Sequence, residues 1–149
     1  MAKSNHYDPL TPALLLQLAA PHTWPAAIMP TLIGAALAMH DTGAVSAFVV
    51  FAVLVIVVCM QSAVNTLNDY FDYKKGADTA DNQVDKTDAV LVFNNINPKS
   101  VKMFIAFLMA FSFAVGSYVI YRAGLIPLVL GVIGAVVVYL YSGGRFPIS

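Results

Sequence analysis

Long stretches without a charged residue constrain the fold of this chain more than any other feature of its sequence. Uncharged residues fill positions 44–67, 103–121 and 123–144. A helix of about 20 apolar residues crosses the roughly 30 Å of hydrocarbon in a bilayer. Each stretch is therefore predicted to be a membrane-spanning helix. The composition agrees, because 59% of the residues are hydrophobic and only 11% are charged, which lies outside the usual range for a soluble domain.

A fourth span is expected near the N-terminus, where residues 9–39 contain no Asp, Glu, Lys or Arg but five prolines. Proline breaks or kinks helices, so residues 11–22 are interpreted as a bent or interfacial helix before the span. A cleaved signal peptide over residues 14–20 is the competing interpretation. The predicted fold class is all-α, an integral membrane helical bundle that forms one domain over 1–149, with four transmembrane helices at about 24–40, 44–67, 103–121 and 123–142.

The basic residues predict the orientation of this bundle. The connection near Asp41 has none, whereas five lysines flank or occupy an Asp-rich loop over about 68–100: Lys74, Lys75, Lys86, Lys99 and Lys102. Connections on the cytoplasmic side carry the excess of Lys and Arg. We therefore expect a multi-pass protein of the cell membrane whose N-terminus, Asp-rich loop and C-terminus are cytoplasmic. The formal net charge of zero gives no basic surface for nucleic acid.

Polar residues form a stripe along the second predicted span. Gln61, Asn65, Asn68 and Asp72 follow one another at spacings of four, three and four residues, which places them on one side of a helix with Asp69 beside them. Interhelical hydrogen bonds explain Gln61 and Asn65. They do not explain Asp69 and Asp72, because two carboxylates one turn apart repel each other unless a cation lies between them.

The acidic residues are unevenly distributed. All eight are aspartates, and six fall within twenty residues: Asp69, Asp72, Asp78, Asp81, Asp85 and Asp88. Mg²⁺ prefers oxygen ligands and combines one or two carboxylates with waters and phosphate oxygens, whereas zinc would call for Cys or His near the cluster. Gly76 is expected to end the helix as its C-cap. For Asp85 and Asp88, the solvated face of a short second helix is an equal alternative.

Three segments resemble the UbiA superfamily of membrane prenyltransferases. NDYFD at 68–72, followed by KKGAD at 74–78, is similar to the first aspartate-rich motif of that family. PHTWPAA at 21–27 resembles its opening helix. YLYSGGRFP at 139–147 is similar to a segment of the branch that prenylates 1,4-dihydroxy-2-naphthoate in menaquinone synthesis. The resemblance covers nearly the whole chain in order.

The resemblance implies a Mg²⁺-dependent transfer of an isoprenyl group from a polyprenyl diphosphate to an aromatic acceptor in quinone biosynthesis, with 1,4-dihydroxy-2-naphthoate favoured. Asn68 and Asp72 would be the catalytic pair, and together with Asp78 they would bind the metal. The further residues implied in binding the diphosphate are Asn65, Asp69, Lys74, Lys75, Asp78 and Asp81. The two lysines are equally well explained as topology signals.

The chain also departs from the family, whose members form a larger bundle with a second aspartate-rich motif on a later loop. It looks like an N-terminal half, and we expect it to be inactive or incomplete alone, with self-association or a C-terminal-half partner covering its polar stripe. Two other classes remain as alternatives. One is a non-enzymatic, cation-conducting or scaffolding membrane protein. The other is the CDP-alcohol phosphotransferases, whose Asp-Gly opening motif this sequence lacks.

Overall fold

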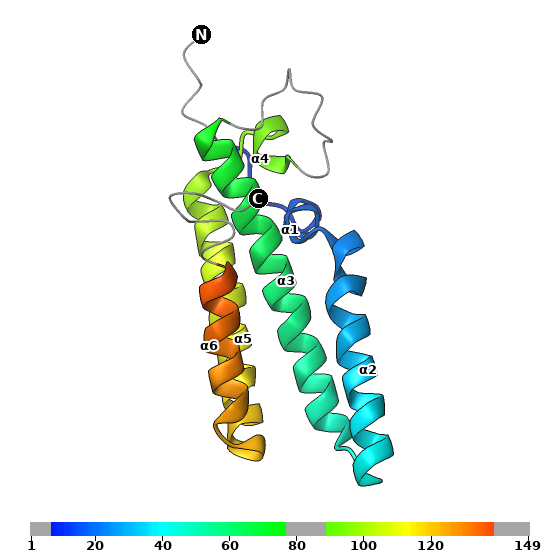
Figure 1. The fold of residues 1–149 in the computed structure, drawn as a ribbon. Coiled ribbons are helices and arrows are strands. Elements are labelled where there is room, and N and C mark those ends of the chain that lie inside the picture. Colours follow the sequence, from blue (N-terminus) through cyan, green and yellow to red (C-terminus); the bar gives the residue numbers. More distant parts are fainter. Residues whose placement is uncertain (1–6, 77–88, 139–149) are drawn as a thin grey trace.

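The chain folds into helices packed side by side (Figure 1). The structure is a computed structural model, and it describes residues 7–76 and 89–138. Within these residues the only pairing of β type is an isolated bridge between Asp8 and Ile96. The elements in chain order are α1 (Pro12–Ala19), the 3₁₀ turn η1 (Pro21–Thr23), α2 (Trp24–Thr42), α3 (Ala47–Lys75), α4 (Val90–Phe93), α5 (Pro98–Ala123) and α6 (Ile126–Val138).

Local capping explains where the two longest helices begin and end. The Ser46 hydroxyl accepts the N–H of Val49 at 3.4 Å at the start of α3, and the Asn97 side chain accepts the N–H of Lys99 at 2.9 Å at the start of α5. These bonds satisfy N–H groups that have no partner inside the helix. Gly76 ends α3 with a φ of 69°, a left-handed conformation that glycine adopts without strain. The predicted C-cap is confirmed.

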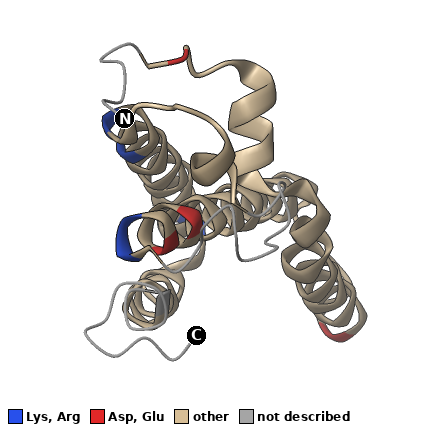
Figure 2. Ribbon diagram, turned by 90° about the horizontal axis from the view of Figure 1, so that it is seen from above, with Lys and Arg blue, Asp and Glu red and all other residues tan. Residues whose placement is uncertain are grey.

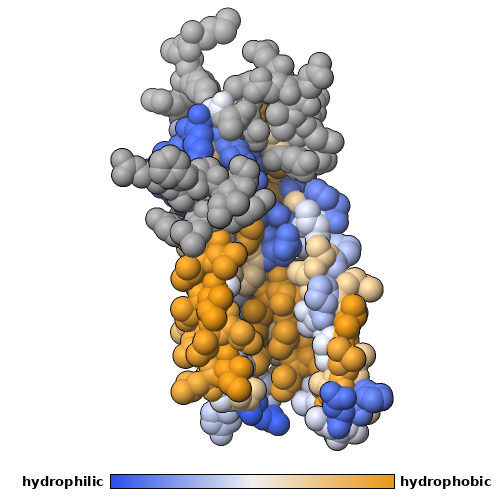
Figure 3. Space-filling view, in the orientation of Figure 1, coloured by the Kyte–Doolittle hydropathy of each residue, from blue (hydrophilic) through white to orange (hydrophobic). Residues whose placement is uncertain are grey.

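Two of the described helices, α3 and α5, have the length and the hydropathy of membrane spans, with mean hydropathies of 2.7 and 2.1. Many of their large apolar side chains are exposed, among them Phe51 and Phe107, which are 63% and 62% exposed. An apolar belt covers the lower part of the molecule (Figure 3). The core helix of a soluble protein would bury such a surface, so the all-α membrane bundle is confirmed. The number of four spans remains a prediction. Over its described residues α6 is shorter than α3 and α5, and α2 does not share their length and hydropathy.

The helices differ in extent from the predicted ones. α3 continues through Lys75, so the first residues of the predicted loop over 68–100 are helical, and α4 and the start of α5 also lie within that range. The bent helix expected over 11–22 appears as α1 and η1, separated by Ala20. The short helix considered around Asp85 and Asp88 lies outside the described residues.

The buried core lies at one end of the bundle, where α1, α4 and the first turns of α5 surround the last turns of α3 (Figure 1). We call this region the cap. Its buried side chains are Leu18, Val90, Leu91, Ile96, Val101 and Ile105. The N–H of Asp8 donates to the carbonyl of Asn95 at 2.9 Å and ties the start of the chain to the same region. The cap therefore orders the end of α3 that carries the acidic motif.

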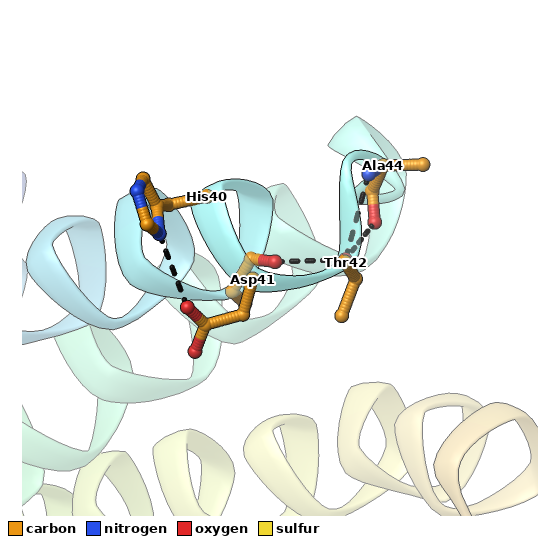
Figure 4. A network of polar contacts seen from close by, with 5 residues as sticks. His40, Asp41, Thr42 and Ala44 are labelled. Carbon is orange, nitrogen blue, oxygen red and sulfur yellow. Dashed lines mark hydrogen bonds and ion pairs between the residues drawn. The ribbon is translucent and has the colours of Figure 1, made fainter.

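The opposite end of the bundle is closed by a tight turn between α2 and α3 (Figure 4). Gly43 ends α2 with a φ of 70°. The Thr42 hydroxyl lies 2.7 Å from the carbonyl oxygen of Ala38 and 2.8 Å from that of Ala44. His40 Nδ1 lies 3.1 Å from a carboxylate oxygen of Asp41, and both side chains are highly exposed. These local contacts set the turn, but exposed pairs of this kind add little stability.

Candidate functional site

The first half of the polar stripe contacts the corner between α1 and α2. Asn65 Nδ2 donates to Thr23 Oγ1 at 2.7 Å and to the Ala19 carbonyl at 3.0 Å. Gln61 Nε2 lies 3.4 Å from Thr23 Oγ1 and 3.4 Å from Asn65 Oδ1. Both residues therefore form hydrogen bonds to a neighbouring helical segment, which is the role expected for them from the sequence.

Three further side chains complete this contact, and the sequence analysis did not identify them. Trp24 Nε1 donates to Ser62 Oγ at 3.0 Å, and Thr66 Oγ1 donates to the Leu18 carbonyl at 3.0 Å. Ser62 and Thr66 stand four residues apart next to the stripe, a spacing that could have indicated a second polar row on α3. We call the group the corner cluster; its members are Thr23, Trp24, Gln61, Ser62, Asn65 and Thr66.

The corner itself contains an unusual backbone conformation. Ala20 has a φ of 46°, the only positive φ of a non-glycine residue in the described part of the chain. A left-handed conformation costs an L-residue roughly 1–2 kcal/mol. The corner is retained because its neighbours are held by hydrogen bonds, including that of Thr23 Oγ1 to the Ala20 carbonyl at 2.9 Å.

Replacing Ala20 by glycine should therefore not destabilise the protein. We expect Ala20→Gly to raise the free energy of unfolding by about 0.5 kcal/mol, because relief of strain exceeds the added entropy of the unfolded chain. Ala13→Gly, at an exposed position in α1, should lower it by about 1 kcal/mol. Thermal or denaturant unfolding in detergent measures both changes. Equal losses in the two variants would show that Ala20 is unstrained.

Asn68 and Asp72 continue the stripe beyond the corner cluster. They stand four residues apart on α3, and both side chains are half-buried. Within the described residues, no hydrogen bond engages the Asn68 side chain. An amide oxygen and a carboxylate one turn apart present oxygen ligands on the same side of the helix. The described residues contain no group of three or more His, Cys, Asp or Glu side chains that could hold a metal ion, so this pair is at most a partial ligand set.

Asp69 does not share this environment. Its side chain is only 5% exposed. Oδ2 accepts the N–H of Val90 at 3.0 Å, and Oδ1 lies 3.5 Å from the N of Leu91. Consecutive residues on a helix point about 100° apart, so Asn68 and Asp72 lie about 100° and about 60° around α3 from Asp69, both on the same flank of it. Asp69 contacts the cap, whereas Asn68 and Asp72 are half-buried beside that contact. The sequence suggested that these two carboxylates would need a cation between them. In the structure their surroundings differ, because Asp69 is buried against α4 and Asp72 is half-buried.

The two lysines at the end of α3 are both exposed but lie on different sides of the helix. Lys75 follows Asp72 by three residues, so it lies on the same side, whereas Lys74 follows by two and lies on the opposite side. The Lys75 ammonium is 5.7 Å from the centre of the Phe71 ring. Viewed from the cap, acidic and basic segments lie together at this helix end (Figure 2). Two further predicted ligands, Asp78 and Asp81, lie outside the described residues.

A pocket of about 340 Å³ lies beside the corner cluster rather than beside Asn68 and Asp72. Helices α1, α3 and α5 and the first residue of α2, Trp24, form it, and its lining includes Leu15, Cys59 and Phe104. These side chains offer no charge for a diphosphate. The candidate polar site is therefore the outward side of the last turns of α3, and this pocket is separate from it.

Comparison with known proteins identifies the family of this chain. Residues 27–149 match the UbiA prenyltransferase family. Over 136 residues the chain is 30% identical to a protein named 1,4-dihydroxy-2-naphthoate octaprenyltransferase from Bacillus subtilis (strain 168). The alignment covers 91% of this chain and 43% of that relative, so the chain spans less than half the length of the curated protein it matches. No solved structure matches the chain. Because the match covers most of the chain and includes the helix with the acidic motif, the chain belongs to the UbiA prenyltransferase family.

Proposed function

We propose that this chain supplies the donor-binding part of a membrane prenyltransferase that moves a polyprenyl group from its diphosphate to 1,4-dihydroxy-2-naphthoate in menaquinone synthesis. The observation that supports this most is the position of Asn68 and Asp72, which are half-buried on one side of a membrane-spanning helix at its polar end. An ionisable group such as Asp72 is costly close to hydrocarbon and is commonly retained where it handles a substrate or an ion.

The residues present fit Mg²⁺ in a partial way. Asp72 offers one carboxylate and Asn68 one amide oxygen, and Mg²⁺ in phosphate sites commonly takes only one or two protein carboxylates beside waters and phosphate oxygens. Asp78 and Asp81 are the proposed further ligands from the connection after Gly76. When bound, Mg²⁺ supplies charge neutralisation for the leaving diphosphate.

The chain's own residues bind and orient the donor. Asn68 and Asp72 would hold the diphosphate end through the cation at the polar rim of α3, because a carboxylate and a diphosphate repel each other directly. The Lys75 ammonium adds a point charge on the same side. The allylic carbon–oxygen bond breaks with its electron pair going to the diphosphate, and a carbon of the electron-rich acceptor ring attacks the allylic cation. In the naphthoate reaction the ring carbon loses its carboxyl group as carbon dioxide. The apolar surfaces of α3 and α5 exclude water from the isoprenyl chain.

A cation-conducting protein is less well supported. A conduction pathway along the stripe would need Gln61 and Asn65 to face water, yet both donate hydrogen bonds to the corner of the chain. The discriminating measurement is Mg²⁺ binding by the purified chain with and without a polyprenyl thiodiphosphate, an unreactive donor analogue. We expect the analogue to tighten Mg²⁺ binding by about tenfold, a normal coupling between two ligands at one site. The same Mg²⁺ affinity with and without the analogue would contradict the proposed function.

The acceptor is tested by transfer of a radiolabelled isoprenyl group in proteoliposomes, with 1,4-dihydroxy-2-naphthoate and 4-hydroxybenzoate as competing acceptors. Since the chain aligns with less than half of the Bacillus relative, the assay is run on the chain alone and on the chain co-expressed with the remaining part of that relative. We expect naphthoate product from the second preparation. Product from 4-hydroxybenzoate alone would contradict the proposed acceptor.

We also propose that the polar end of α3 lies on the cytoplasmic side, as the lysines predict. In a Cys59→Ala background, Lys99→Cys at the start of α5 should react with a membrane-impermeant maleimide only in inverted vesicles. Asp41→Cys, in the opposite turn, should react in right-side-out vesicles. Both positions are exposed, so accessibility reports the side of the membrane. The reverse labelling pattern would place the site on the outer side.

A further inference from the structure

We propose that Asp69 is a positioning residue rather than a ligand: its buried carboxylate anchors α4 to α3 and so fixes the orientation in which Asn68 and Asp72 face the donor. The functional half of this inference rests on the proposed function. The anchoring half depends only on the geometry of the described residues.

The first turn of α4 has no N-capping side chain from its own residues. The N-cap position is Ala89, which makes no side-chain capping bond. The first N–H groups of a helix have no intrahelical acceptor, and leaving them buried and unpaired is costly. Val90 and Leu91 are only 1% and 3% exposed. Asp69, which lies 21 residues away from Val90 in the sequence, supplies the missing acceptor through its bond to Val90 N at 3.0 Å.

A carboxylate suits this position better than a neutral side chain. Both of its oxygens face backbone nitrogen atoms, at 3.0 and 3.5 Å. Hydrogen bonds to a charged acceptor are about twice as strong as neutral ones, which offsets the cost of burying the charge. The side chain is only 5% exposed, which leaves little of it open to a solvated metal ion. The side chain is therefore built into the cap and is not available to the donor site.

The anchor has a direct consequence for the neighbouring residues. Val90 and Leu91 pack in the cap core with Leu18, Ile96 and Val101, so the carboxylate connects α3 to the whole cap. With Asp69 fixed against the cap, the rotation of α3 about its axis is set, and Asn68 and Asp72 are held about 100° and about 60° around the helix on one flank of it. Loss of the anchor should loosen the donor site without removing any of its ligands.

The test compares Asp69→Asn with Asp72→Asn in the purified chain, using hydrogen exchange at the amides of residues 90–94 and Mg²⁺ titration in the presence of polyprenyl thiodiphosphate. Asparagine keeps the shape of Asp69 but replaces one acceptor oxygen with a donor. We expect exchange in α4 to become about tenfold faster in Asp69→Asn. Donor affinity should fall by about threefold to tenfold, because the site is less ordered. At saturating analogue, the Mg²⁺ concentration at half-saturation should rise far less than in Asp72→Asn, because both proposed ligands are still present.

Asp72→Asn should show the opposite pattern, with unchanged exchange in α4 and a raised Mg²⁺ requirement. Asp41→Asn, at the exposed far turn, is the matched control and should change neither readout. Unchanged α4 exchange together with a raised Mg²⁺ requirement in Asp69→Asn would overturn the inference. If even the parent chain binds no donor, the proposed function fails, whereas faster exchange in α4 would still establish the anchor.

A measurement on the parent chain covers the case in which Asp69→Asn does not fold. Because the Asp69 carboxylate is already engaged by backbone N–H groups, adding Mg²⁺ and the donor analogue should leave or increase the protection of the Val90 and Leu91 amides. A carboxylate recruited to the metal would release them. Faster exchange at these two amides on addition of Mg²⁺ and analogue would refute the inference.

Discussion

Asp72→Asn should reduce Mg²⁺-dependent binding of a polyprenyl diphosphate by about a hundredfold, the scale associated with losing one preorganised charge contact at a diphosphate. The change keeps the shape of the side chain and removes the charge that pairs with the cation. Asp72 is half-buried at the end of α3 and lies outside the buried core of the cap. The helical content should therefore be unchanged.

The measurement is calorimetric or radiometric binding of the donor analogue, with circular dichroism as the check on folding. Lys75→Gln and Lys74→Gln form a matched pair, because each removes one positive charge from neighbouring exposed positions. Only Lys75 lies on the same side of the helix as Asp72, so only its loss should weaken binding. Full donor affinity in Asp72→Asn would remove this residue from the site.

Asn65→Leu should lower the free energy of unfolding by about 2 kcal/mol, the scale for losing two side-chain hydrogen bonds of about 1 kcal/mol each. The substitution takes a hydrogen bond from Thr23 Oγ1 and another from the Ala19 carbonyl. Asn68→Leu removes the same amide one turn later, where no described hydrogen bond engages it. That variant should lose donor binding while keeping its stability.

The two effects can be separated by a double-mutant cycle. Thr23→Val and Asn65→Leu remove the two partners of one hydrogen bond of 2.7 Å, so their combined cost should be smaller than the sum by about 1 kcal/mol. Additive losses would show that the corner cluster is not coupled. Equal destabilisation by Asn65→Leu and Asn68→Leu would contradict the division of the stripe into a structural half and a binding half.

Several features of this protein could be predicted from sequence because they depend on local chemistry. The uncharged stretches 44–67 and 103–121 indicated the helices α3 and α5, since a polypeptide in hydrocarbon must satisfy its backbone groups within a helix. Gly76 was identified as the end of α3 because glycine tolerates a left-handed conformation. The spacing of Gln61 and Asn65 indicated interhelical hydrogen bonds. The resemblance to UbiA prenyltransferases agreed with the family match over residues 27–149.

Only the tertiary structure separated Asp69 from Asp72. In the sequence the two residues look alike, as acids three positions apart on one amphipathic helix. In the structure Asp69 is a buried acceptor for the first N–H group of α4, on Val90, which is 21 residues away in the sequence. Asp72 is half-buried. Which side of a helix packs against which neighbour depends on contacts distant in sequence. For that reason helical spacing identified the acidic cluster, but it did not assign roles within it.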